Sequence, residues 1–226
     1  MPERTELPAQ IIADLKRRAA ESAVCYIESG MVVGLGSGTT AAFAVRRLGQ
    51  LVRSGRLQRI VGIPTSREVA ALARDQGIAL TTLEDRSVVD VTIDGADEID
   101  PDLNLIKGRG GAMLHERIVA HASRCLLIVA DERKMVPCLG TRVPLPVEVV
   151  PFGWVLAARR LATLGAKVQR RLVGAEAVLT DEGNYLLDCH FGAIHDPIGL
   201  ERAIQAIPGV VSHGLFLDIA TMVIIG

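Results

Sequence analysis

Apolar residues along the first 130 positions follow two alternating patterns. Short β-branched runs, typical of buried strands, alternate with longer stretches in which apolar residues recur every three or four positions, as on one face of a helix. The strand pattern covers residues 31–35, 59–63, 88–94 and 124–130, and the helical pattern covers residues 8–30, 39–52, 66–77 and 111–122. Strands that alternate with helices are typical of right-handed βαβ units. The pattern therefore predicts an α/β protein with a mostly parallel sheet, in which Pro8 begins the first helix and Gly30 caps its end.

The pattern changes after about residue 135. A helical stretch, 152–164, lies between two strand-like segments, and a polar, glycine-containing centre further on is typical of a hairpin turn between residues 177–180 and 185–190. The closing residues 209–226 return to apolar strand character and are expected to pair back into the main sheet. We therefore predict a main catalytic domain and a smaller α+β domain inserted into it, with the first at residues 1–137 and 213–226 and the second at residues 138–212.

Composition and charge are those of an ordinary globular protein. Hydrophobic residues make up 49% of the 226 residues but aromatic residues only 3%, so the core has to be built from aliphatic side chains. The net charge of −1 provides no general field that would attract nucleic acid or an acidic membrane surface. The N-terminus lacks the apolar segment of a signal peptide, and the longest apolar run, residues 125–130, is too short to span a bilayer. We expect a soluble cytoplasmic protein that binds neither nucleic acid nor membrane.

The segment GLGSGTT, residues 34–40, joins a predicted strand to a predicted helix. Its glycines allow a tight turn, its hydroxyl side chains are donors, and the N-terminus of the following helix favours an anion. It is neither a dinucleotide-binding motif nor a P-loop, since Thr39 takes the place of the last glycine and no lysine follows. Two interpretations stay open for this segment alone: a phosphate site, or a glycine turn with a threonine cap.

A cluster of acidic residues follows the predicted strand that ends at residue 94. Five carboxylates fall within nine positions: Asp94, Asp97, Glu98, Asp100 and Asp102. Their mutual repulsion would raise some of their pKa values unless a cation lies nearby. Considered alone, the segment is more typical of a solvated acidic turn in which Asp94 or Asp97 caps the next element.

A glycine-rich turn further along the chain supplies a cation for this cluster. Lys107 and Arg109 lie in the turn, and Glu116 lies about one and a half turns into the helix that follows. An exposed glutamate paired with an arginine is the alternative for Glu116, but its apolar neighbours are compatible with a partly desolvated carboxylate of raised pKa. Because ligands gather at the carboxyl ends of parallel strands, we expect the three loops to form an acid/base site for a small phosphorylated substrate.

Six segments together resemble the type A ribose-5-phosphate isomerases in their order and spacing: GLGSGTTA, DGADEID, LIKGRGGAMLHE, ADERKMV, PLPVEVVP and IPGVV. The resemblance runs from the first helix to the C-terminal strand. It implies interconversion of ribose 5-phosphate and ribulose 5-phosphate in the non-oxidative pentose phosphate pathway, without a metal or an organic cofactor. It also implies a Rossmann-like main domain with helices on both faces of the sheet, a smaller inserted domain, and a homodimer or homotetramer.

The resemblance also implies roles for individual residues. Glu116 matches the family's proton acceptor, Asp94 and Lys107 match the residues that open the ring and hold charge on the enediolate oxygens, and Asp97 matches a hydroxyl-binding carboxylate. The remaining matched substrate-binding positions are Lys16, Ser37, Gly38, Thr39, Thr40, Gly95, Ala96, Gly108, Arg109, Gly110 and Lys134. Glu98, Asp100 and Asp102 are expected to be structural or to face solvent. His115 and Arg117 depart from the family pattern, which often has Arg and Lys there, and neither departure removes a catalytic group.

Two other functions are compatible with a sheet of this kind. A non-catalytic sugar-phosphate sensor would need a DNA-reading module, and the single N-terminal helix leaves no room for one. A sugar-phosphate deaminase or lactonase would share the phosphate loop but would commonly recruit a histidine. A hydride-shift isomerase would require a metal, and the histidines show no convincing ligand spacing.

Overall fold

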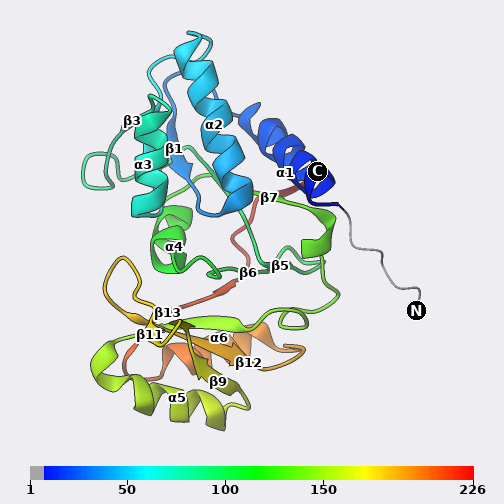
Figure 1. Cartoon of the computed structure of the whole chain (residues 1–226), viewed down its shortest axis with the longest axis vertical. Coiled ribbons are helices and arrows are strands. Elements are labelled where there is room, and N and C mark those ends of the chain that lie inside the picture. The colour runs from blue at the N-terminus through cyan, green and yellow to red at the C-terminus, as the bar shows by residue number, and fades with distance from the viewer. Residues whose placement is uncertain (1–7) are drawn as a thin grey trace.

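A six-stranded parallel sheet forms the centre of the computed structural model, which describes residues 8–226 (Figure 1). Its strand order is β15-β7-β4-β1-β2-β3, with every neighbouring pair parallel. The strands are β1 (Val32–Leu35), β2 (Val61–Pro64), β3 (Ala79–Leu80), β4 (Val91–Asp94), β7 (Leu126–Ala130) and β15 (Met222–Ile225). The predicted parallel sheet is confirmed, and so is the return of the C-terminal segment to it, because β15 pairs with β7.

Helices cover both faces of this sheet. The helices are α1 (Ala9–Val24), α2 (Thr39–Arg53), α3 (Arg67–Asp75) and α4 (Met113–His121). Val33 and Leu35 of β1 belong to the same apolar cluster as residues of α1, α2 and α3, whereas Val32 packs with Val119 of α4. Successive residues of a strand face opposite sides. A strand buried on both sides must therefore be apolar throughout, which explains the unbroken runs in the sequence.

The first helix is shorter than its apolar spacing predicted. It ends at Val24, with Cys25 as its C-cap, so the prediction that Gly30 caps it is wrong. Gly30 instead has a φ of 90° in the connection to β1, where its N–H donates to the carbonyl of Gln58. Ile27, which continued the helical spacing, is buried in the core from this connection. Burial alone therefore produced the apparent periodicity beyond Val24.

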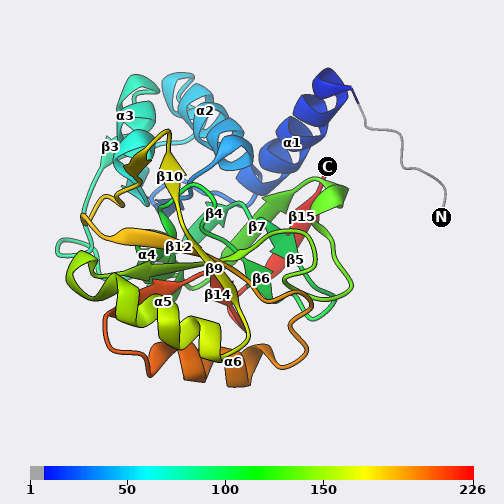
Figure 2. The ribbon, with the colours of Figure 1, turned by 60° about the horizontal axis from the view of Figure 1, so that its bottom comes forward.

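A four-stranded antiparallel sheet with order β13-β8-β12-β9 lies beside the main sheet (Figures 1 and 2). Its elements are β8 (Leu145–Val149), β9 (Lys167–Arg170), β12 (Tyr185–His190) and β13 (Val210–His213), with the helices α5 (Trp154–Thr163) and α6 (Pro197–Gln205). Ala157 and Leu161 of α5 and Ile204 of α6 share one apolar cluster with this sheet.

The predicted hairpin around residues 181–184 is only partly present. The turn forms, since Thr180 N–H donates to the carbonyl of Asn184 at 2.9 Å. Strand pairing across it is a single bridge between Leu179 and Tyr185, because β12 pairs with β8 and β9 instead. The segment before the turn contributes to a short ribbon of β10 (Leu172–Val173) and β11 (Glu176–Ala177).

A three-stranded sheet with order β14-β6-β5 connects the two larger sheets. It consists of β5 (Glu98–Ile99), β6 (Leu105–Ile106) and β14 (Leu215–Phe216), and two 3₁₀ turns, η1 (Glu132–Lys134) and η2 (Pro151–Gly153), complete the described elements. The chain passes from β13 in the antiparallel sheet through β14 to β15 in the main sheet. The domain division at residues 138 and 212 stays a prediction. Within residues 8–226, no helix combines the length and apolar character needed to cross a membrane.

Glu98, one of the five clustered carboxylates, is fully buried and structural. Its Oε1 accepts the backbone N–H groups of Arg142 at 2.5 Å and Val143 at 2.8 Å, and its Oε2 accepts that of Gly140 at 2.5 Å. Asp100 likewise closes a local turn by accepting the N–H groups of Asp102 and Asn104. Backbone N–H donors stabilise both carboxylates. Two of the five clustered acids therefore have a structural role, because they fix the conformation of nearby backbone segments.

Replacing Glu98 by alanine should lower the free energy of unfolding by about 3 kcal/mol, because three partly buried N–H groups lose their acceptor. Urea unfolding measures this change. Glu84→Ala, at an exposed position, is the matched control and should change the value by less than about 0.5 kcal/mol. Equal stability of the two variants would show that these backbone bonds contribute nothing.

Candidate active site

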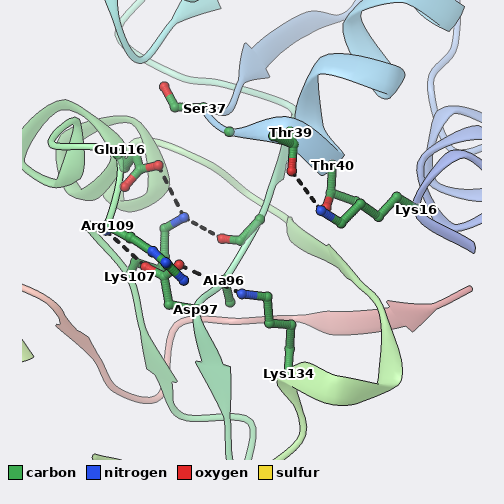
Figure 3. Close-up of a pocket in the computed structure, with 14 residues that line it drawn as sticks. Lys16, Ser37, Thr39, Thr40, Ala96, Asp97, Lys107, Arg109, Glu116 and Lys134 are labelled. Carbon is green, nitrogen blue, oxygen red and sulfur yellow. Dashed lines mark hydrogen bonds and ion pairs between the residues drawn. The ribbon is translucent and has the colours of Figure 1, made fainter. Parts of the chain in front are cut away.

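Three loops enclose one cavity at the carboxyl end of the main sheet (Figure 3). The loops follow β1, β4 and β6, and α1 and η1 add one lysine each. β6 belongs to the three-stranded sheet, so the third loop approaches from outside the main sheet. The lining consists of Lys16, Ser37, Gly38, Thr39, Thr40, Gly95, Ala96, Asp97, Lys107, Gly108, Arg109, Gly110, Glu116 and Lys134.

The loop after β1 delivers the N-terminus of α2 to the cavity. Gly38 precedes the helix with a φ of 96°, and no side chain within residues 8–226 caps the first N–H groups of α2. Such groups have no partner within a helix, and with the helix dipole they favour an anion. Lys16 of α1 lies alongside, with Nζ 2.9 Å from Oγ1 of Thr39. The absence of a capping side chain at this described helix end favours the phosphate site over the capped turn.

Ser37 contributes to this loop differently from the threonines. Its hydroxyl hydrogen-bonds the Thr65 hydroxyl at 2.8 Å and donates to the Ser66 hydroxyl at 3.0 Å, and its side chain points away from the cavity in Figure 3. Thr65 and Ser66 therefore fix the loop from behind. Glycine is required next to it, because a Cβ on Gly36 would lie 2.3 Å from Oδ1 of Asp94.

A buried cluster of three charges forms the opposite wall. Nζ of Lys107 lies 3.0 Å from Oδ2 of Asp94 and 3.3 Å from Oε1 of Glu116, and it also donates to the carbonyl of Gly95. The exposed fractions of these three residues are at most 5%. The ring of Phe216 lies under the ammonium, with its centroid 5.6 Å from Nζ. Oε2 of Glu116 is buried and has no hydrogen-bond partner among residues 8–226.

Burial dominates the protonation of this cluster. Burial, the largest cause, and the charge of Asp94 together raise the pKa of Glu116 to about 8 against the opposing charge of Lys107. Burial also raises the pKa of Asp94 against the attraction of Lys107. For Lys107, burial acts to lower the pKa, but the two carboxylates outweigh it and the pKa is raised. Lys107 is thus an ammonium at neutral pH, and Glu116 is a carboxyl group that exchanges its proton near neutrality.

The rim of the cavity is less buried than this cluster. Oδ2 of Asp97 accepts the backbone N–H of Arg109 at 2.9 Å, and its Oδ1 lies 4.0 Å from Nζ of Lys134. Burial lowers the pKa of Lys16, with the nearby Lys134 and Arg133 adding to the effect against Asp131. Cations from α1 and η1 therefore both line this cavity.

The structure brings the predicted site residues together with one exception. Asp94 is 1% exposed and lies behind Lys107 instead of lining the cavity. His115 hydrogen-bonds Glu182 at 2.8 Å, outside the lining, and Arg117 also lies outside it. Sequence reasoning missed Thr65, Ser66 and Phe216, and no local pattern marks them, because each reaches the site from a distant segment.

No group of three or more His, Cys, Asp or Glu side chains within residues 8–226 is arranged to hold a metal ion.

Comparison with known proteins identifies the family. The family described as ribose 5-phosphate isomerase A (phosphoriboisomerase A) matches residues 61–226. A ribose-5-phosphate isomerase A from Roseiflexus castenholzii is 56% identical over 93% of this chain and 90% of its own length. One from Gloeobacter violaceus is 55% identical over 93% of this chain and 91% of its own length.

Solved structures of the same name share the fold. A D-ribose-5-phosphate isomerase in complex with phospho-erythronic acid has a TM-score of 0.92 at 40% identity, covering 94% of this chain and 93% of that chain. The ribose 5-phosphate isomerase of Plasmodium falciparum has a TM-score of 0.91 at 39% identity, covering 93% of each chain.

The fold is that of an α/β enzyme whose cavity is lined by three lysines, and the matched proteins are aldose-ketose isomerases. The chain belongs to the ribose 5-phosphate isomerase A family. The resemblance seen in the sequence is confirmed, and neither the sensor nor the deaminase or lactonase alternative is favoured.

Replacing Gly36 by alanine should lower the free energy of unfolding by about 1 to 3 kcal/mol, since Asp94 or the loop has to move away from the new Cβ. Thermal or urea unfolding measures the effect. Gly110→Ala is the matched control, because a Cβ there meets no atom within 4 Å, and its change should stay within about 0.5 kcal/mol. A Gly36→Ala protein as stable as this control would contradict the close approach to Asp94.

Proposed function

We propose that this cavity interconverts D-ribose 5-phosphate and D-ribulose 5-phosphate by proton transfer through a cis-enediolate, with Glu116 as the proton acceptor. The observation that carries the proposal is the position of Glu116. Glu116 belongs to the lining of the cavity, its Oε2 accepts no hydrogen bond from the residues that the structure describes, its Oε1 is 3.3 Å from the Lys107 ammonium, and its pKa is raised to about 8. A base works best when its pKa lies near the working pH.

The distribution of charge over the cavity orients the substrate. The phosphate binds at the N-terminus of α2 with Thr39, Thr40 and Lys16, where unpaired N–H groups and an ammonium favour an anion. The open-chain carbon skeleton then extends towards Glu116 and Lys107. The relative solved with phospho-erythronic acid supports this, because that acid combines a phosphate with a planar anionic carboxylate, as the enediolate would.

Glu116 moves the proton that distinguishes aldose from ketose. Its carboxylate takes the proton from C2, the C–H electrons form the C1–C2 double bond, and the aldehyde oxygen O1 becomes negative. The Lys107 ammonium stabilises that charge. A proton then passes from O2 to O1, and Glu116 returns its own proton to C1, which leaves a ketone at C2. The step needs one base and one fixed cation, and the buried cluster holds both.

Asp94 acts in this proposal through Lys107. Its carboxylate is 3.0 Å from Nζ and accepts the N–H of Gly95 at 2.7 Å, so it holds the ammonium in place while remaining outside the lining. Asp97, on the rim, binds sugar hydroxyls and Lys134 adds positive charge near the phosphate. The place in the non-oxidative pentose phosphate pathway, the cytoplasmic location and the homo-oligomer stay predictions.

The direct test is conversion of ribose 5-phosphate to ribulose 5-phosphate by the purified protein in the presence of EDTA. The reaction is run in D₂O, and both ketose formation and deuterium at C1 are followed. A proton-transfer mechanism incorporates solvent deuterium. Ketose that carries no deuterium at all would argue for direct transfer of hydrogen between the carbons.

Glu116→Gln should lower kcat by about 10² to 10⁴ with a much smaller change in KM, since the amide keeps the shape but cannot accept the proton. Steady-state kinetics on ribose 5-phosphate measure the split. Glu84→Gln, at an exposed carboxylate outside the cavity, is the control and should turn over like the wild type. Comparable turnover in Glu116→Gln would reject Glu116 as the base.

The value of kcat/KM should rise as the pH rises, with an apparent pKa of about 8. The base has to be ionised to act, and burial is the main reason why the pKa of Glu116 is raised to about 8. Below it, kcat/KM falls about tenfold per pH unit. The profile is read between about pH 7 and 9.5, where the phosphate of the substrate, whose second pKa is near 6, stays dianionic. A flat profile across this range would show that Glu116 is ionised well below neutrality.

A further inference from the structure

An ion pair in the antiparallel sheet reaches the loop beside the active site. Arg171 directly follows β9, and Asp188 lies on the adjacent strand β12. Nε of Arg171 donates to Oδ2 of Asp188 at 2.9 Å, and Nη2 donates to Oδ1. Both side chains are at least four-fifths buried. The planar guanidinium is thus held in one orientation by two parallel bonds to one carboxylate.

The third nitrogen of the same guanidinium holds the loop after β6. Nη1 of Arg171 donates to the carbonyl of Gly108 at 3.1 Å and to the carbonyl of Arg109 at 2.9 Å. On its other side, the N–H of Arg109 donates to Asp97 at 2.9 Å. The loop is therefore fixed from both sides, by a carboxylate on the rim of the cavity and by a guanidinium from the antiparallel sheet.

The loop needs such support because its backbone is unusual. Gly108 has a φ of 108°, in the left-handed region, and it directly follows Lys107, whose ammonium lies between the two buried carboxylates. Gly108, Arg109 and Gly110 all line the cavity. A shift of about 1 Å in groups that position a substrate can cost about 10²-fold in rate.

We propose that Arg171 is a positioning residue for the isomerisation, oriented by Asp188, and that it holds the 108–110 loop in the conformation that binds the sugar. The inference rests on the proposed function, because it assumes that this loop contacts substrate. Arg171 acts through the loop carbonyls and lies outside the lining of the active-site cavity. Lysine cannot replace it, since one ammonium cannot bond the carboxylate at two points and reach both carbonyls.

A neighbouring cavity makes a sharp test possible. Arg171 and Asp188 line this second cavity together with Arg109 and Asp97, which also line the first. Its opening gives a small cation access to the space that the Arg171 side chain would vacate. In the Arg171→Ala variant, free guanidinium ion at millimolar concentration should therefore bind beside Asp188 and restore the bonds to the loop.

Arg171→Ala should lower kcat/KM for ribose 5-phosphate by about 10- to 100-fold. Guanidinium chloride should restore at least about a third of the lost kcat/KM. Sodium chloride at equal ionic strength is the reference for this rescue. Arg170→Ala is the matched control. Arg170 is the preceding residue, but its guanidinium stacks on Trp154 and Tyr185, at 4.6 and 5.2 Å from the ring centroids. Its activity should stay near wild type and should not respond to guanidinium.

Two further variants separate positioning from stability. Arg171→Lys, which keeps the charge, should fold with a melting temperature close to wild type and still lose at least about fivefold in kcat/KM. Asp188→Ala should cost little more when Arg171 is already alanine, because the two residues act as one unit. Wild-type kcat/KM in Arg171→Lys, or an Arg171→Ala loss that guanidinium leaves unchanged, would overturn the proposal.

The activity of the wild-type protein distinguishes a failure of the proposed function from a failure of the role proposed for Arg171. A wild-type protein without isomerase activity defeats the proposed function. An active wild type with an equally active Arg171→Ala variant defeats only the role of Arg171.

Discussion

The buried charges of this site depend on the position of one ammonium group. Lys107 lies between the carboxylates of Asp94 and Glu116 in a nearly solvent-free place. Two buried carboxylates at this separation would not both tolerate a charge without it, and the lysine would not stay protonated without them. Within the described part of the chain, one oxygen of Glu116 is left without a hydrogen-bond partner. The ion pairs that stabilise the buried charges therefore also hold Glu116, the proposed base, in the lining of the cavity.

The antiparallel sheet and the turn beyond β11 do more than enlarge the molecule, because their contacts reach the loop after Lys107 and the helices α3 and α4. Arg171 bonds the loop after Lys107. The turn beyond β11 reaches two helices: Asp181 accepts the N–H of Arg67 at the start of α3, and Glu182 bonds His115 on α4. Arg117, next to Glu116, donates to the His213 carbonyl and stacks on Phe216 at 4.4 Å. The helix that carries Glu116 is thus held by the antiparallel sheet through His213 and by the three-stranded sheet through Phe216.

Local patterns predicted β1, β4 and β7 of the central sheet well because every residue of these strands is buried and most are apolar. They missed β3, which has only two residues, an exposed Ala79 and a half-buried Leu80. They failed where burial and helical spacing coincide, as at Ile27, which follows the helical period but lies in a connection. They also failed for the hairpin, because β12 gains more pairing from β8 and β9 than from the segment across its turn. The matched motifs contain most of the residues that line the cavity. They did not predict that Asp94 lies behind Lys107, or that the hydroxyl of Ser37 hydrogen-bonds Thr65 and Ser66.

The sequence by itself determined the alternation of strands and helices, the glycine turns, and the acidic and basic residues that belong to the site. These features depend on conformational preferences and spacings within a few residues of chain. Only the tertiary structure decided that Glu98 is structural, that Asp94 lies behind Lys107, and that Phe216 and Arg171 reach the site from about 110 and 60 residues further along the chain. How deeply a side chain is buried, and which groups it contacts, depends on which distant segments pack together. A local sequence pattern does not contain that information.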